Sequence, residues 1–168
     1  MSTKANDLID EHGLPRYFDM QAKLGYTKHI GGSDATRELL KLCQMTPDKT
    51  GLNVGCGAVT TTTYIVENFG CNVVGVDIKE NMGESAINWS KLKGVVDQTE
   101  FRVANAQDLP FENDFFVILI CESINIFVLK KSKSIYKIQA CSQTGRGNWI
   151  ERADPHQSSP TKCCGIIS

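Results

Sequence analysis

The chain has 168 residues, of which 41% are hydrophobic and 22% charged, the balance of one ordinary globular domain. A formal net charge of −1 gives no electrostatic reason to expect a nucleic acid or an anionic membrane as partner. No apolar run approaches the roughly 20 residues that cross a bilayer, and no cleavable leader is visible, so we expect a cytoplasmic protein. The 7 cysteines form no C-x-x-C pair, and no metal site is expected.

The first 50 residues have helical periodicity, with one apolar stripe. That stripe consists of Ala35, Leu39, Leu42 and Cys43. Beyond it, short apolar runs alternate with helical patterns. Strands are expected at 52–54, 72–76, 101–104 and 116–121. Helices are expected from the first glycine-rich turn to Phe69, with Gly70 closing the helix, and over about 79–93.

This alternation predicts an α/β fold, namely a Rossmann-like doubly wound sheet that is mostly parallel and has right-handed crossovers. The run from Phe116 to Cys121 is apolar almost throughout, as in strands that are covered on both faces. The β-branched residues from Thr60 to Thr63 predict a weakly helical first turn after the first strand.

A glycine pair marks the turn after the first strand. Without side chains at Gly55 and Gly57, the backbone can approach a cofactor, and the following helix N-terminus favours an anionic group. Asp77 ends the next strand, 20 residues beyond Gly57, where a carboxylate can accept hydrogen bonds from both ribose hydroxyls of an adenosine cofactor. A nicotinamide dinucleotide and S-adenosylmethionine (SAM) both fit. The dinucleotide fingerprint requires a third glycine where this chain has Thr60, which favours SAM.

Four motifs occur in the order typical of one enzyme family. They are YTKHIGG (26–32), GLNVGCG (51–57), VVGVDIKENM (73–82) and FRVANAQDLPF (101–111). From about residue 17 to 127 the chain resembles the class I SAM-dependent methyltransferases, especially the branch that acts in ubiquinone and menaquinone biosynthesis. The resemblance implies a seven-stranded sheet of order 3-2-1-4-5-7-6, of which this chain is expected to supply only 3-2-1-4. Its cofactor would be SAM, and its partner a small-molecule methyl acceptor.

The resemblance also implies a set of cofactor contacts. These are Tyr26, His29, Asn53, Gly55, Cys56, Gly57, Asp77, Ile78, Met82, Asn105, Ala106, Cys121 and Glu122. In the family pattern, Gly55, Cys56 and Gly57 would line the methionine end of SAM, and Asp77 would hold the ribose. Ile78 would lie on the adenine face.

The remaining positions would surround the cofactor. Met82 would share the adenine face, while Asn105 and Ala106 would bind the adenine edge. Cys121 and Glu122 would stand where methyl donor and acceptor meet. No general base can be named, because Glu122 is the one ionisable candidate nearby and is equally suited to a structural role.

Tyr26 and His29 would fold over the far end of the cofactor. Four departures from the family pattern together predict weaker cofactor binding. Asn53 replaces an acidic residue, Ala58 and Val59 add bulk where glycine is usual, and Asn105 replaces an aspartate. Val117 stands where an aspartate commonly opens strand four.

The sequence changes character after about residue 136. We expect a methyltransferase part over 1–136 and an irregular tail over 137–168. Family members continue here with a segment like YKRVLKPGGYIGLNE. Codons allowed for Cys141 to Gly147, read one base later, encode Val-Leu-Lys-Pro-Gly-Gly, and the match extends on both sides. We therefore interpret the tail as an out-of-frame translation, which would leave the outer edge of strand four open to self-association.

Three functions are compatible with these observations. The first is a SAM-dependent methyltransferase, inactive if its remaining strands are lacking. The second is a non-catalytic fragment that self-associates through its open edge or binds a partner. The third is an NAD-dependent dehydrogenase, which Thr60 disfavours.

Overall fold

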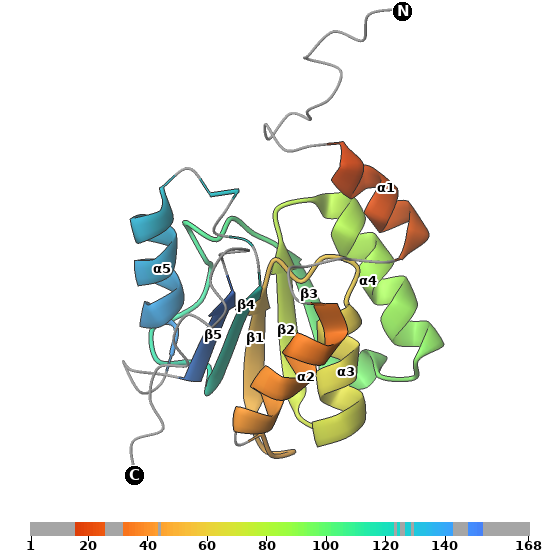
Figure 1. The fold of residues 1–168 in the computed structure, drawn as a ribbon, viewed down its shortest axis with the longest axis horizontal. Helices are drawn as coiled ribbons and strands as arrows, with labels where there is room; N and C mark the ends of the chain where they lie inside the picture. The colour runs from red at the N-terminus through yellow and green to blue at the C-terminus, as the bar shows by residue number, and fades with distance from the viewer. Residues whose placement is uncertain are drawn as a thin grey trace, which may run out of the picture.

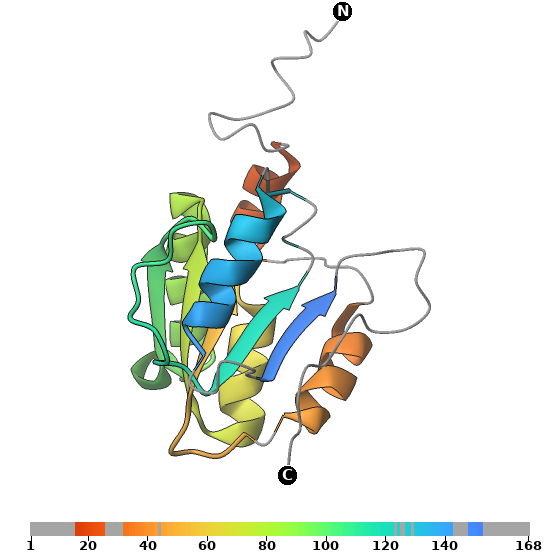
Figure 2. The same cartoon turned by 90° about the vertical axis from the view of Figure 1, so that its left-hand side faces the viewer.

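A computed structural model describes residues 16–25, 32–43, 45–122, 124, 127–128, 130–142 and 148–152. These residues form a parallel five-stranded sheet of order β3-β2-β1-β4-β5 with helices on both faces (Figures 1 and 2). The strands are β1 (Thr50–Val54), β2 (Asn72–Asp77), β3 (Thr99–Val103), β4 (Ile118–Glu122) and β5 (Asn148–Arg152). The α-helices are α1 (Tyr17–Leu24), α2 (Gly32–Leu42), α3 (Thr60–Phe69), α4 (Glu80–Leu92) and α5 (Lys131–Ala140). The predicted α/β class and the strand order 3-2-1-4 are confirmed.

Two apolar layers hold the helices to the sheet. On one face, Leu40 of α2 and Ile65 of α3 pack against Val73, Ile118 and Ile120. Each of these side chains is at most 1% exposed, and burying one of them contributes about 1.5–3 kcal/mol. Strands covered in this way on both sides explain the nearly continuous apolar runs in the sequence.

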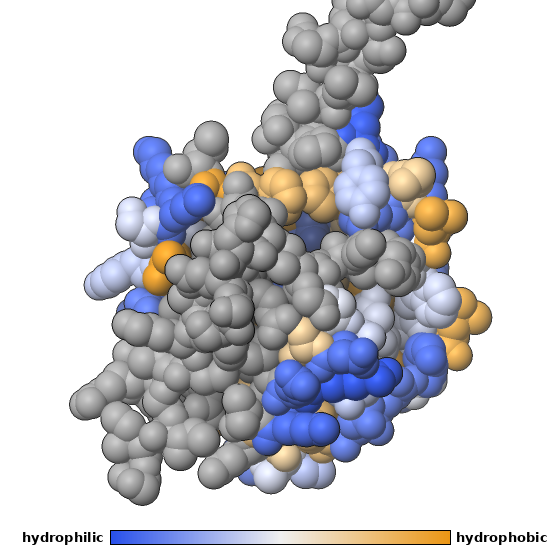
Figure 3. Space-filling view, viewed as in Figure 1, coloured by the Kyte–Doolittle hydropathy of each residue, from blue (hydrophilic) through white to orange (hydrophobic). Residues whose placement is uncertain are grey.

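On the other face, Ile138 of α5 packs against Leu52, Val54 and Leu119. The opposite side of the molecule, over α2, is hydrophilic (Figure 3), since Asp34, Arg37, Glu38 and Lys41 are exposed. Helix α2 therefore presents a polar face to water, while Leu40 and the adjacent Cys43 are buried against the sheet. Leu40 was not part of the predicted apolar stripe.

The region after residue 136 differs from the sequence-based expectation. Helix α5 runs across the predicted boundary to Ala140, and β5 lies parallel to β4, with Ile118 paired to Asn148 and Glu122 to Arg152. The expectation of an irregular tail is wrong at these two elements. The edge of β4 is paired, so the open edge on which self-association was predicted does not exist. Strand β5 was missed because NWIER lacks the alternation and apolar run that indicate a strand.

The packing of α5 can be tested on two of its residues. Ile138 is fully buried and Tyr136 is 77% exposed. We expect Ile138→Ala to lower the free energy of unfolding by about 2–5 kcal/mol, because it removes buried methyl groups and leaves a cavity. Tyr136→Ala should change it by less than about 0.5 kcal/mol. Urea unfolding measures both, and equal effects would show that α5 is not packed on the sheet.

The reading-frame hypothesis remains a prediction. In the shifted frame, the codons for residues 148–152 would encode Ile-Gly-Leu-Asn, at the same positions as β5. Sequencing of the coding DNA should show this frame open through Val-Leu-Lys-Pro-Gly-Gly and beyond. A stop codon in the shifted frame within codons 137–153 would refute the hypothesis.

Candidate functional site

The sheet reverses its strand order between β1 and β4. The chain passes from β1 outward to β2 and β3, and then returns to the other side of β1 as β4. In open α/β sheets, ligands bind at such a switch point, outside the carboxyl ends of the strands. Here these ends are Val54, Asp77 and Glu122.

The glycine loop adopts a backbone that requires its glycines. Gly55 and Gly57 have φ of +68° and +53°, in the left-handed region. The N–H groups of Gly55 and Cys56 donate to Val76 O of β2 at 2.7 and 3.0 Å, which anchors the loop to the neighbouring strand. A Cβ at Gly55 would overlap the side chain of Ile124. The loop is therefore a close-fitting cradle at the switch point.

Val59 has a backbone conformation that favours glycine. Its φ is +74°, and it directly precedes α3. A β-branched residue in this region costs about 1–3 kcal/mol, and such strain often occurs at functional sites. Val59 is only 1% exposed, so its side chain is packed. The loop therefore accommodates the side chain of Val59 and still keeps the left-handed backbone conformation at this residue.

Asp77 joins the loop to the end of β2. Its Oδ2 accepts a hydrogen bond from Gly57 N, and its Oδ1 accepts one from Lys79 N, both at 3.0 Å. Burial raises the pKa of this carboxyl, while bonds from the backbone N–H groups of Lys79, Gly57 and Ile78 and the charge of Lys79 oppose the rise. Each oxygen keeps acceptor capacity for a further donor. The carboxylate thus braces the loop and can still bind a hydroxyl.

Cys56, inside the loop, is not a nucleophile. Its side chain is buried at 6% exposure. Burial, and then the nearby charge of Asp77, raise the pKa of its thiol well above the usual value. The residue is therefore a neutral thiol at physiological pH, and its contribution to the loop is one of shape.

Two predicted site residues hold helices to the sheet. The carboxylate of Glu122 accepts hydrogen bonds from Thr36 Oγ1 of α2 at 2.6 Å and from Thr61 Oγ1 of α3 at 2.9 Å. The amide of Asn53 donates to Thr62 Oγ1 of α3 at 3.0 Å. Sequence reasoning missed these threonine partners, because the run of four threonines indicated only a poor helix start. The sequence signal for these contacts was the run of threonine hydroxyls after the first strand, where they can bond polar side chains of the sheet.

Other predicted residues lie in different surroundings. Met82 is 2% exposed and packs with Ala22 and Ala58, while Cys121 is fully buried among the side chains facing α5. Ile78 and Ala106 are partly buried. Asn105 is exposed, and its Oδ1 accepts a hydrogen bond from Gln107 N at 2.9 Å, so the expected acceptor oxygen closes a local turn.

Tyr26 and His29 lie outside the described residues. Within the described part of the chain, no three His, Cys, Asp or Glu side chains gather in a way that could hold a metal ion. No helix among the described residues is long and apolar enough to cross a membrane.

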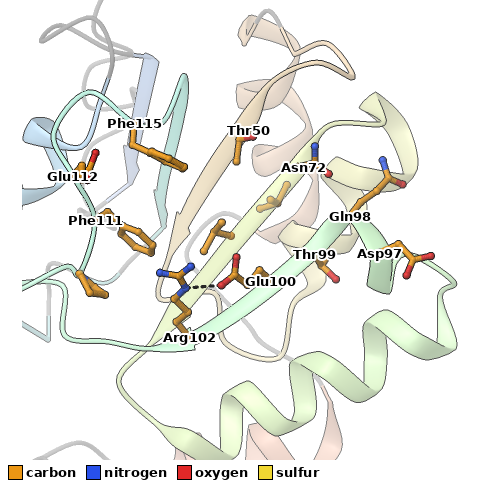
Figure 4. A pocket seen from close by; sticks show the side chains of 13 residues that line it. Thr50, Asn72, Asp97, Gln98, Thr99, Glu100, Arg102, Phe111, Glu112 and Phe115 are labelled. Atoms are coloured by element: carbon orange, nitrogen blue, oxygen red, sulfur yellow. Dashed lines mark hydrogen bonds and ion pairs between the residues drawn. The ribbon is translucent and has the colours of Figure 1, made fainter.

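Two cavities are lined by described residues. The larger, about 510 Å³, is lined by the starts of β1, β2 and β3 and by the loop that carries Phe111 and Phe115 (Figure 4). Arg102 lies within it, paired with Glu100 at 2.6 Å. The smaller, about 290 Å³, borders the glycine loop at Ala58 and Val59 on the helix side. Neither is lined by Gly55 or Asp77, so cavity size alone does not locate the site.

The hydrogen bonds of Glu122 predict a stability effect. Glu122→Met removes the acceptor for both hydroxyls, and we expect a loss of about 1–3 kcal/mol in the free energy of unfolding. The loss should shrink in a Thr36→Val background, because one of the bonds is already absent there. Urea unfolding of the four variants measures the coupling. The control is Glu112→Met at an exposed acid, and equal losses at both positions would contradict this role.

Comparisons with known proteins identify the family of the chain. A family profile described as a methyltransferase domain matches residues 52–141, more than half of the chain. The chain is 36% identical over 104 residues to an uncharacterised protein of Haemophilus influenzae, covering 61% of this chain and 41% of that protein. It is 30% identical to phosphoethanolamine N-methyltransferase 3 of Arabidopsis thaliana, over 53% of this chain and 18% of the relative. For the demethylmenaquinone methyltransferase of Bacillus cytotoxicus the identity is 29%, over 60% of this chain and 42% of the relative.

Solved structures share the fold. The MccD protein superposes with a TM-score of 0.69 at 18% identity, over 74% of this chain and 54% of that one. Geranyl diphosphate C-methyltransferase of Streptomyces coelicolor, solved with S-adenosylhomocysteine, gives 0.66 at 20% identity, over 71% and 43%.

The fold is that of a SAM-dependent methyltransferase domain, and the family match supports SAM over the nicotinamide alternative. The chain belongs to the methyltransferase-domain family. It spans about two fifths of the length of the Haemophilus protein and of the demethylmenaquinone methyltransferase that it matches.

Proposed function

We propose that this chain binds SAM at the carboxyl ends of β1 and β2, and that the protein transfers the methyl group to a small-molecule acceptor. The observation that carries this proposal is the pairing of the Gly55–Gly57 cradle with the carboxylate of Asp77. The two glycines place no side chain of their own between the backbone and a ligand, although the side chain of Ile124 lies against Gly55. The carboxylate has acceptor capacity for two vicinal hydroxyls. The residues present therefore fit the cofactor.

Each part of the loop has a separate task in this proposal. Gly55 and Gly57 let the backbone approach the methionine end, and the N-terminus of α3 favours its carboxylate. Asp77 holds the ribose, with Ile78 against the adenine face and the turn at Asn105 and Ala106 at its edge. The described residues assign no general base.

The remaining predicted residues act around this centre. Tyr26 and His29 are proposed to cover the far end of the cofactor. Asn53 and Glu122 act indirectly, because their hydrogen bonds fix α2 and α3 beside the site. Met82 and Cys121 support the site from the core.

SAM supplies an electrophilic methyl group on its sulfonium sulfur. The task left to the protein is to hold donor and acceptor in line and to exclude water, and such positioning accounts for a large part of the rate in methyl transfer. The named relatives act on phosphoethanolamine and demethylmenaquinone, and one structural neighbour on geranyl diphosphate. Since the atom that receives the methyl group differs among them, nitrogen in one name and carbon in another, we propose only a small-molecule acceptor. A cytoplasmic location is proposed because Cys56, Cys71 and Cys141 are buried thiols that form no disulfide with any described residue.

Cofactor binding is tested by titration calorimetry with S-adenosylhomocysteine. We expect saturable binding, and a loss of roughly ten- to a hundredfold in affinity for Asp77→Asn, because hydrogen bonds to a charged group contribute about 1.5–3 kcal/mol. Binding should also weaken as the pH falls through the raised pKa of Asp77, since protonation removes the ionised acceptor.

The control variant is Asp97→Asn, an exposed acid in the turn before β3, which should bind like the unmodified chain. NADH serves as the competing ligand and should give no binding. Binding of NADH but not of S-adenosylhomocysteine would refute the proposal. Binding without methyl transfer to any acceptor would identify a non-catalytic cofactor-binding fragment.

A further inference from the structure

Helix α1 bridges the two sides of the switch point. On one side, the ring of Phe18 meets the ring of Phe127, beyond β4, edge to face with centroids 5.1 Å apart. On the other side, α1 packs along α4, and the two helices lie side by side (Figure 1). At the end of α1, a Cβ on Gly25 would overlap the indole of Trp89 of α4. Helix α1 is therefore seated closely on its neighbours.

An ion pair between the buried Lys79 and the partly exposed Asp19 lies at the junction of α1 and α4. Lys79 is 5% exposed, and its ammonium lies 2.6 Å from Asp19 Oδ1 of α1. Asn81 Nδ2 donates to the same oxygen at 3.0 Å. A lysine is almost never buried to this extent without a partner, and removal of one member of a buried pair typically costs about 3–5 kcal/mol. The undocking of α1 would leave this charge without its Asp19 partner.

The same lysine contacts the proposed ribose ligand. The backbone N–H of Lys79 donates to Asp77 Oδ1 at 3.0 Å, while its side chain extends to Asp19. The other Asp77 oxygen accepts from Gly57 N of the loop. Lys79 therefore connects α1 to the carboxylate that braces the loop. Its ammonium binds Asp19 of α1, and its backbone N–H binds Asp77.

Apolar contacts reinforce this connection. Ala22 of α1 is 5% exposed and packs with Ala58 of the loop and Met82 of α4, with Phe18 alongside. Two amide oxygens on the same helices, Gln21 Oε1 and Asn81 Oδ1, are buried and make no hydrogen bond to any described residue. Buried acceptors of this kind favour a positive charge at the junction over a neutral side chain.

We propose that Lys79 is a positioning residue, which couples the docking of α1 to the carboxylate of Asp77 and so makes cofactor affinity depend on the Asp19–Lys79 pair. This inference rests on the proposed function. In it, the ion pair keeps α1 docked on the loop, because either partner alone leaves a charge unmatched at the junction. The docked helix holds the turn of residues 77–79 in the geometry that binds a ribose. Two sites that share one docked element influence each other reciprocally, so cofactor binding should in turn protect α1.

The test uses the full chain with S-adenosylhomocysteine and two readouts. Hydrogen exchange of the amides of residues 17–24 reports the docking of α1 without ligand, and calorimetry reports affinity. We expect Asp19→Asn and Lys79→Met each to speed exchange in this segment at least tenfold and to weaken binding about tenfold. Lys79→Arg should retain both properties in large part, because it keeps the charge. Asp34→Asn, at an exposed acid that pairs with Arg37 on α2, is the matched control and should change neither.

A double variant separates this role from loss of folding. In Asp19→Leu/Lys79→Met an apolar pair replaces the ion pair, an exchange that is often tolerated. We expect α1 to regain its protection from exchange and the affinity at pH 7.5 to recover.

Three results would overturn the inference while S-adenosylhomocysteine still binds the unmodified chain. The first is unchanged exchange of residues 17–24 in both single variants. The second is faster exchange with unchanged affinity. The third is a double variant that folds but regains neither the protection of residues 17–24 nor the affinity. Absence of binding by the unmodified chain would instead refute the proposed function, and the coupling with it.

Discussion

The carboxylate of Asp77 is the interaction on which the rest of the site depends. It stands at the end of β2 and accepts hydrogen bonds from the loop that follows β1 and from the turn that leads into α4. Three segments are thereby fixed to one pair of oxygens. Because the carboxylate is largely removed from water, its charge is costly, and the surrounding N–H groups and the ammonium of Lys79 offset that cost.

Around this centre the helices are positioned by polar contacts as well as by the core. The apolar layers bring α2, α3 and α5 to the sheet, but apolar packing is tolerant of small shifts. The hydrogen bonds from Thr36 and Thr61 to Glu122, and from Asn53 to Thr62, have directions and fixed lengths. They set where the N-terminus of α3 stands relative to the ends of β1 and β4.

Local patterns in the sequence were sufficient to predict those parts of the fold whose signal lies within a few neighbouring residues. The strands that became β1, β2 and β4, the glycine turn and the acid at Asp77 each have a signal within a few residues. The ion pair of Lys79 with Asp19 and the bonds of Glu122 join residues about 60 to 90 positions apart, and no spacing rule links such partners. Strand β5 was missed for a different reason, since its stability comes from pairing with β4 and its composition does not indicate a strand.

Val59 shows that this left-handed turn forms without a glycine. Its backbone is left-handed although its side chain is β-branched, so the hydrogen bonds from Gly55 and Cys56 to Val76, together with Asp77, impose the turn from outside. Glycine at position 59 would therefore lower the strain of the turn, but the turn does not depend on it. A search pattern that insists on glycine here would pass over this chain, whereas one written in backbone angles would find it.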